Sequence, residues 1–170
     1  MTDYRPLILT ALFEPETQSR FQRLRDNHFP PERNIVPAHL TLFHHLPGGE
    51  IEAIRGRLAQ ISRLTPSPRA DVVGLRSLGK GVAFTIRAPE LEAVRAELAD
   101  AWTPLLVPQD RQGWRPHVTV QNKARPDEAR ALLAQLEASF SPWGARIEAL
   151  RLWRYLDGPW EALGEFRFRG

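Results

Sequence analysis

The chain has 170 residues, 42% of them hydrophobic, which is enough apolar material for one sizeable core. It contains no cysteine, and this excludes a disulfide framework, a thiolate nucleophile and a sulfur-ligated metal site. The formal charge of +3 is too small for a protein that coats nucleic acid. The apolar runs are too short to cross a bilayer, and residues 1–16 lack the basic start of a signal peptide, so we expect a cytoplasmic protein with no membrane contact.

In chain order, the first half predicts a strand, a helix, a strand and a helix. Residues 5–15 form an apolar run typical of a buried strand, and residues 17–29 place apolar side chains at helical spacing. After a proline-rich loop over 30–37, residues 38–46 alternate as a strand does. Residues 51–64 carry one apolar helical stripe.

The second half continues with the same signals. They predict a hairpin over 70–89 that turns at 79–81, a helix over 90–102, an alternating strand over 115–123, a helix over 126–140, and two strands over 145–170 that turn at 157–159. Paired strands with helices on one side favour an α+β fold over a doubly wound parallel sheet.

One short motif occurs in both halves. His39 to Leu42 and His117 to Val120 both read His-apolar-Thr-apolar, a pattern expected about 0.04 times by chance in this composition. Each copy lies on a predicted strand and is followed by a helix. The repeat indicates a single domain, 1–170, of two similar lobes that contribute motif strands near 38–44 and 115–122.

The geometry of a strand sorts the motif side chains into two faces. Successive residues point to opposite faces, so His39, Thr41 and Phe43 are predicted to lie together, as are His117 and Thr119. The aliphatic positions between them pack under the helices. A His/Thr face in the core would leave polar groups unsatisfied, so these faces either contact bulk water or line a cleft.

Two imidazoles and two hydroxyls in one cleft suit metal-free phosphoryl transfer. One ring can accept a proton while the other donates one, and threonine hydroxyls can hold the phosphate oxygens. A single copy of the motif is more often a solvated strand face, but two copies favour a site. A metal site made of His39, His44 and His45 is disfavoured, because the adjacent His44 and His45 should point to opposite faces. We predict that His28, His44 and His45 are structural or solvated.

At these motifs the chain resembles the two-histidine (2H) phosphoesterase superfamily, in the branch of bacterial 2′,5′ RNA ligase-like proteins and cyclic phosphodiesterases. The resemblance implies a bilobal α+β fold with pseudo-two-fold symmetry, in which two mainly antiparallel sheets flanked by helices surround a central cleft. It implies catalytic roles for His39, Thr41, His117 and Thr119. It also implies chemistry on 2′,3′-cyclic phosphates or 2′,5′ linkages with no metal and no cofactor.

Other residues are predicted to hold the substrate. The candidates for stacking on a base are Phe43, Trp114, Trp153 and Tyr155, and the candidates for pairing with phosphate are Arg115, Lys80 and Arg154. Arg115 is preferred among the cations because it is in phase with His117. Arginine supplies nearly all the positive charge, but a bias in base composition explains that as well as phosphate binding does.

We therefore expect a monomeric, metal-independent phosphoesterase that acts on RNA ends or small nucleotides with a cyclic phosphate or a 2′,5′ linkage. The same step run in reverse would make it a 2′,5′ RNA ligase. The alternative is an RNA- or nucleotide-binding module that uses the same cleft without turnover. A metal-dependent hydrolase is a third reading.

Overall fold

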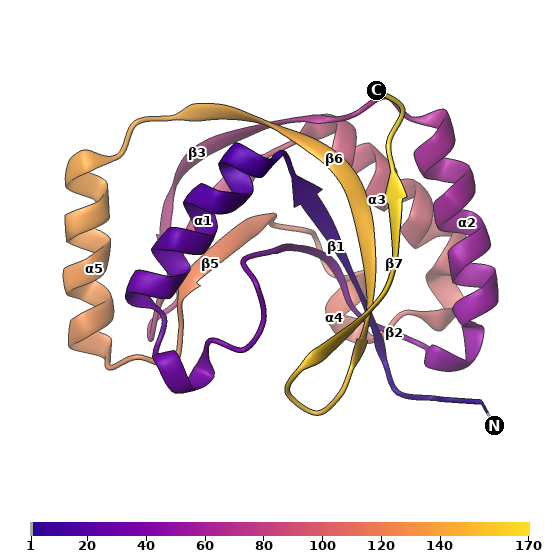
Figure 1. Ribbon diagram of the computed structural model, residues 1–170, viewed down its shortest axis with the longest axis horizontal. Helices are drawn as coiled ribbons and strands as arrows, with labels where there is room; N and C mark the ends of the chain where they lie inside the picture. The colour runs from indigo at the N-terminus through magenta and orange to yellow at the C-terminus, as the bar shows by residue number, and fades with distance from the viewer. Residues whose placement is uncertain (1) are drawn as a thin grey trace.

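The computed structural model describes residues 2–170, which form seven strands and five α-helices (Figure 1). The strands are β1 Leu7–Phe13, β2 Leu40–Leu46, β3 Arg69–Ser77, β4 Val82–Arg87, β5 His117–Gln121, β6 Trp143–Tyr155 and β7 Trp160–Arg167. The helices are α1 Pro15–His28, α2 Ile51–Leu64, α3 Pro89–Trp102, α4 Pro108–Arg111 and α5 Pro126–Ser139. Short 3₁₀ turns cover Pro31–Arg33, Gly48–Glu50 and Thr103–Leu105. Every predicted strand and helix is present, and the four-residue α4 is the one addition.

All strand neighbours are antiparallel, and the sheet order is β1-β2-β5-β4-β3-β6-β7 with a further pairing of β1 with β6. The predicted antiparallel α+β fold is confirmed. The strands expected in two sheets are hydrogen-bonded into one, because β6 is long enough to pair with β3 through its first residues and with β1 through the rest. Its curved path over the molecule is visible in Figure 1. The two-fold relation between lobes and the single domain 1–170 stay predictions.

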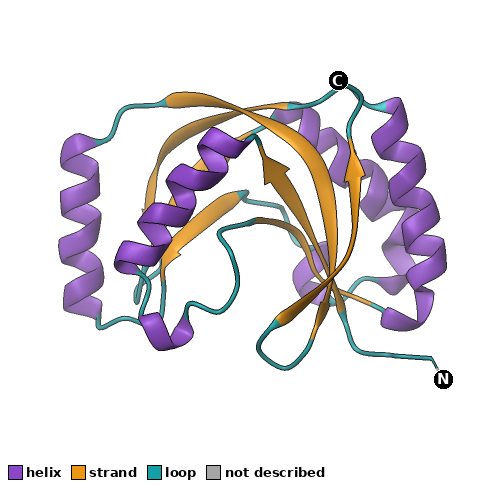
Figure 2. Cartoon of the chain, viewed as in Figure 1, coloured by secondary structure: helices purple, strands orange, loops and turns teal. Residues whose placement is uncertain are grey.

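Helices flank the curved sheet on both sides (Figure 2). One group packs beside β5, β4 and β3, where α1 contacts β5 and α5 contacts β3 and β4. The other group lies toward the opposite end, where α2 contacts β6 and β7 and α4 contacts β2. The two motif strands, β2 and β5, are therefore neighbours in the sheet that lie between the two groups of helices.

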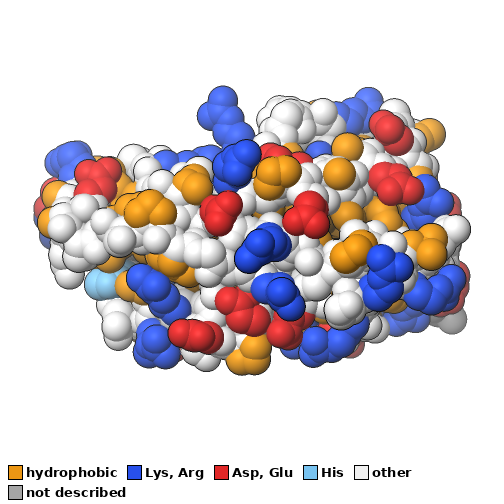
Figure 3. All heavy atoms as spheres, turned by 90° about the horizontal axis from the view of Figure 1, so that it is seen from above, with side chains coloured by type: hydrophobic (Ala, Val, Ile, Leu, Met, Phe, Trp, Pro, Cys, Tyr) orange, Lys and Arg blue, Asp and Glu red, His pale blue; other side chains and the backbone are white. Residues whose placement is uncertain are grey.

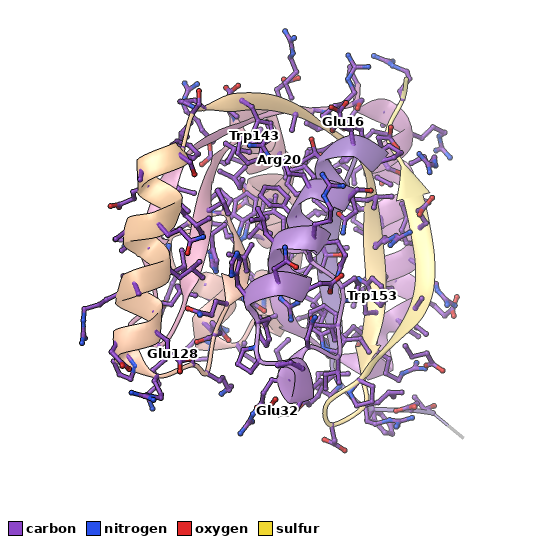
Figure 4. All side chains as sticks on the ribbon, turned by 60° about the vertical axis from the view of Figure 1, so that its left-hand side comes forward. Glu16, Arg20, Glu32, Glu128, Trp143 and Trp153 are labelled. Atoms are coloured by element: carbon purple, nitrogen blue, oxygen red, sulfur yellow. The ribbon has the colours of Figure 1, made fainter. Side chains whose placement is uncertain are left out.

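The core near α1 is rich in aromatic side chains. The Phe21 ring of α1 lies 5.4 Å from Phe13, 5.5 Å from Phe84 and 5.6 Å from Trp143, centroid to centroid. The guanidinium carbon of Arg20 lies 3.6 Å from the centroid of the Trp143 ring, and Figure 4 shows this pair where α1 approaches α5. These contacts hold α1 against the sheet, and α1 in turn carries side chains that position a motif.

The hairpin turn between β3 and β4 shows why glycines stand there. Gly79 has φ +82°, a conformation that other residues rarely adopt, and a Cβ at Gly81 would collide with the carbonyl oxygen of Gln121. The turn predicted at 79–81 is therefore confirmed, and its second glycine lets the end of β5 lie close to it.

Acidic and basic side chains are interspersed over the face of the molecule in Figure 3, so the small positive charge does not form one patch there. Within residues 2–170, every helix is too short or too polar to span a bilayer.

Candidate active site

The two motifs meet across one pair of strands. Leu40 of β2 pairs with Val118 of β5, and both side chains are fully buried. Because the strands are antiparallel, this register places His39 across from Thr119 and Thr41 across from His117. Each histidine therefore lies beside the threonine of the other motif. All four side chains line one cavity of about 400 Å³, which we call the histidine cavity.

Both histidine rings are held in the same way. The Nδ1 atom of His39 lies 2.7 Å from the carbonyl oxygen of Pro37, and that of His117 lies 2.8 Å from the carbonyl oxygen of Arg115. A carbonyl oxygen only accepts, so each Nδ1 carries the hydrogen and each Nε2 is left free to exchange a proton. Each partner is two residues before its histidine, so the sequence builds the same local bond twice.

The backbone before His39 is held by α1. The side-chain amide of Gln18 donates to the carbonyl oxygen of Ala38 (2.7 Å), and the backbone N–H of Ala38 donates to the side-chain oxygen of Gln22 (2.8 Å). His39 itself precedes β2, so these bonds replace the strand ladder that would otherwise fix its position. Gln18 and Gln22 were not identified from the sequence as site residues, although their spacing of four residues places them on the same face of the helix.

A buried arginine links α1 to the second motif and to the loop that precedes the first. Arg25 is 3% exposed; its Nε donates to the side-chain oxygen of Asn34 (2.9 Å) and its Nη1 to the carbonyl oxygen of Thr119 (3.3 Å). Burial lowers the pKa of Arg25 to about 10, which leaves it charged at neutral pH. Arg25 therefore places a fixed positive charge beside the histidine cavity.

This environment keeps both rings neutral in the free protein. Burial lowers the pKa of His39 to about 4; the bond to Pro37 opposes this shift, while the charge of Arg25, and the charges of His117 and His44 when those rings are protonated, add to it. The pKa of His117 is also lowered, first by burial and then by the charges of Arg76 and His44, against the effect of its bond to Arg115. At pH 7 each Nε2 thus carries a lone pair.

Aromatic side chains form one wall of the histidine cavity. The Trp160 ring lies 4.7 Å from the His39 ring, centroid to centroid, and Tyr155 also lines the cavity. Trp153 lies behind Trp160 at 5.9 Å and is 8% exposed; its indole N–H donates to Thr10 Oγ1 (2.9 Å). Figure 4 shows Trp153 along β6, well away from Trp143. Tyr155 reaches the cavity, Trp153 supports its wall, and Trp160 is a lining residue that the sequence reasoning missed.

Phe43 does not line the cleft, so that prediction is wrong. Between the pairs Leu9 with Phe43 and Thr10 with Thr41, β2 advances two residues while β1 advances one. This bulge breaks the alternation after Thr41 and turns Phe43 into the core, where it is fully buried. Its ring lies 5.4 Å from the Trp102 ring.

A second irregularity in β2 changes the expectation for His44 and His45. Between the pairs Leu7 with Leu46 and Leu9 with Phe43, β2 again has an extra residue. Both histidines are exposed and both line the histidine cavity, instead of lying on opposite faces. The sequence predicted that His44 and His45 are structural or solvated. They are solvated, and they also line the candidate active site.

A second cavity, of about 690 Å³, adjoins the first, and the two share Thr41, His44 and His117 as lining residues. Arg115 and Trp114 line this second cavity, and the Trp114 indole donates to the carbonyl oxygen of Thr41 (2.9 Å). Arg76 and Arg95 line it as well, and neither was among the sequence candidates. Lys80 lies in the β3–β4 turn and lines neither cavity, and Arg154 instead pairs with Asp3 and Glu161.

Comparison with known families decides the relationship. The model of the 2′-5′ RNA ligase superfamily matches residues 13–159, which include both motifs. The chain belongs to the 2′-5′ RNA ligase superfamily. None of the curated proteins matches this superfamily member in sequence.

Solved structures share the fold of this 2′-5′ RNA ligase superfamily member over nearly its whole length. TT0787 of Thermus thermophilus is 19% identical with a TM-score of 0.66, covering 97% of this chain and 98% of that one. E. coli LigT, in a complex with 3′-AMP, is 17% identical with a TM-score of 0.66, covering 99% and 100%. A protein described as a phosphoesterase is 19% identical with a TM-score of 0.62, covering 98% and 99%. At these identities the likeness shows the fold.

Acidic groups are sparse around the histidines of this superfamily member. Within residues 2–170, no three His, Asp or Glu side chains converge as metal ligands would. The carboxylate nearest to His44, Asp110, is instead bonded to the backbone and the ring of that residue.

Proposed function

We propose that this protein is a metal-independent phosphoesterase that acts on 2′,3′-cyclic phosphate or 2′,5′-linked RNA and nucleotides, with His39, Thr41, His117 and Thr119 as its catalytic residues. One observation carries the proposal: two neutral imidazoles, held by matching backbone bonds, line one cavity with a threonine beside each. Superfamily membership supports this reaction class. The E. coli LigT structures with 3′-AMP, NADP+ and ATP support nucleotides as the class of ligand.

Hydrolysis of a cyclic phosphate needs one proton acceptor and one proton donor. His39, whose pKa is held at about 4, is neutral and takes a proton from the attacking water as the new P–O bond forms. A bound phosphate anion raises the pKa of His117, so this ring binds a proton and gives it to the 2′ or 3′ oxygen as the old P–O bond breaks. The products are a phosphate monoester and a free hydroxyl.

The other residues hold the reacting group. Thr41 and Thr119 can donate hydrogen bonds to the non-bridging phosphate oxygens, which positions the phosphorus and stabilises charge that develops in the transition state. Trp160 and Tyr155 offer flat surfaces on which a base can stack. When a hydroxyl of a second RNA end attacks in place of water, the same two proton transfers form the new P–O bond and release the other ring oxygen as a hydroxyl, which is the 2′,5′ ligase reaction. The monomeric state and the cytoplasmic location stay predictions.

The test is hydrolysis of 2′,3′-cyclic nucleotides and 2′,5′-linked dinucleotides in excess EDTA. His39→Ala and His117→Ala should each lower kcat about 10²–10⁴-fold. His28→Ala is the matched control, because that histidine lies at the end of α1 and lines neither cavity. Circular dichroism checks that each variant is folded. Wild-type rates in both cavity variants would refute the mechanism, while tight nucleotide binding without turnover would favour the binding-module alternative.

A further inference from the structure

The second cavity has a strongly unbalanced charge. Three arginines line it, Arg76, Arg95 and Arg115, and none of its lining residues is acidic. A cavity of similar volume elsewhere, about 710 Å³, is lined by Glu14, Asp71 and Glu148 together with two arginines, so it has no excess of positive charge. We call the unbalanced one the arginine cavity. An excess of guanidinium groups in a concave site attracts and holds anions.

Two of these arginines are free to bind a ligand. Within residues 2–170, neither Arg76 nor Arg115 makes an ion pair or a side-chain hydrogen bond. Register places Arg76 in one row with Ala83 and Thr119 on adjacent strands. Because Ala83 is small, the long side chain of Arg76 can extend over it toward the second motif. This agrees with the effect of the Arg76 charge on His117.

The third arginine is a fixed part of the wall. Arg95 is 8% exposed; its Nε donates to the carbonyl oxygen of Leu42 and its Nη2 to the carbonyl oxygen of Asp110, both at 2.9 Å. Among residues 2–170 no carboxylate forms an ion pair with Arg95, so its positive charge is compensated by carbonyl dipoles, by the nearby Asp110 and by the Phe43 and Trp114 rings, whose centroids lie 4.7 Å and 5.5 Å from the guanidinium carbon. The site therefore has one buried arginine fixed by hydrogen bonds as well as two whose side chains are available to a ligand.

His44 stands where the two cavities join, and a buried carboxylate orients it. Asp110 is 1% exposed; it accepts the backbone N–H of His44 (2.9 Å), the backbone N–H of His45 (2.9 Å) and the His44 Nδ1–H (3.2 Å). With Nδ1 bonded in this way, Nε2 of His44 is left for the cavities. A third imidazole is thus built into the boundary, and the two-histidine reaction does not use it.

We propose that the arginine cavity binds a second phosphate group of the substrate, so that the preferred substrates carry a phosphate next to the one held by the two motifs. Arg76 and Arg115 are the residues that contact it, and His44 lies between the two phosphates. The shared chemistry is a phosphate, whose source is either the next phosphodiester of an RNA chain or the 5′-phosphate of a mononucleotide. The inference rests on the proposed function for the identity of the first phosphate.

Binding of product-like ligands tests this without turnover. Calorimetry compares the Kd of adenosine 2′-phosphate with that of adenosine 2′,5′-bisphosphate and of a 2′-phosphorylated adenylyl dinucleotide. The wild type should bind at least one of the two-phosphate ligands about tenfold or more tightly than the one-phosphate ligand. Preference for the dinucleotide alone identifies an RNA chain as the source, and preference for the bisphosphate alone identifies the mononucleotide.

The variants Arg76→Gln and Arg115→Gln should reduce this Kd ratio toward one. The control is Arg130→Gln, an exposed arginine on α5 that lines neither cavity. A ratio near one in the wild type, no binding of any of the three ligands, or an unchanged ratio in both cavity variants would overturn the inference. Turnover of cyclic phosphates is measured separately: absent turnover with an intact ratio rejects the proposed function alone, and turnover with a ratio near one rejects only the second phosphate site.

Discussion

Acid should destabilise the protein through His39. The folded-state pKa of about 4 lies below the ordinary value of 6.5, so the unfolded chain binds a proton on this ring first as the pH falls. The contribution to stability is therefore fully present above pH 6.5 and is lost as the pH falls toward 4. Between pH 7 and pH 5 this difference corresponds to about 2 kcal/mol, and screening at a half-buried ring reduces it to about 1–2 kcal/mol.

The variant His39→Asn removes this titration while keeping a polar side chain at the position. Urea unfolding at pH 7, 6 and 5 should show the wild type losing about 1–2 kcal/mol more of its free energy of unfolding than the variant over that range. The lowered pKa of His117 also reduces the free energy of unfolding as the pH falls, but His117 is present in both proteins, so it does not account for a difference between them. His45→Asn, at an exposed histidine, is the control and should follow the wild type. Parallel curves for the wild type and His39→Asn would show that burial does not hold the ring neutral, and the reasoning would be wrong.

Three further predictions concern side chains around the site. Trp160→Ala removes the ring that contacts His39, so KM for a nucleotide substrate should rise about tenfold while the melting temperature changes little. Phe43→Ala should lower the free energy of unfolding by about 3–5 kcal/mol, seen in urea, because it empties a fully buried position; a changed KM with unchanged stability would return Phe43 to the cleft. Asp110→Asn should cost about 1–3 kcal/mol, since an amide group replaces an acceptor of three N–H groups; an unaffected urea midpoint would show that those bonds contribute nothing.

Much of the architecture could be predicted because local patterns agreed with tertiary packing. Each strand and helix of the expected order is present, and Leu40 and Val118 lie buried and paired, as the alternation of the motifs required. What failed is the extension of that alternation beyond Thr41. A bulge depends on the partner strand, here β1, and the sequence of β2 alone gives no sign of it.

The candidate site was predictable only where residues adjoin the motifs. Trp160 lies more than a hundred residues from His39 in sequence, and the pairing of β6 with both β1 and β7 brings the two together. Arg25 and Arg76 likewise reach the second motif from α1 and β3. One sequence signal was available: an aromatic residue stands on each side of the β6–β7 turn. Tyr155 was among the predicted substrate-binding residues, whereas its cross-strand partner Trp160 was not.

The central claim is that His39 and His117 act together in a single metal-free step, and a double-mutant cycle in excess EDTA tests it most directly. The measured quantity is kcat/KM for a 2′,3′-cyclic nucleotide in the wild type, His39→Ala, His117→Ala and the double variant. If the two rings act as a unit, the double variant should be about as slow as either single variant. If the fold-losses in kcat/KM of the two single variants multiplied in the double variant, the claim would be contradicted. Loss of wild-type activity on chelation would also contradict it.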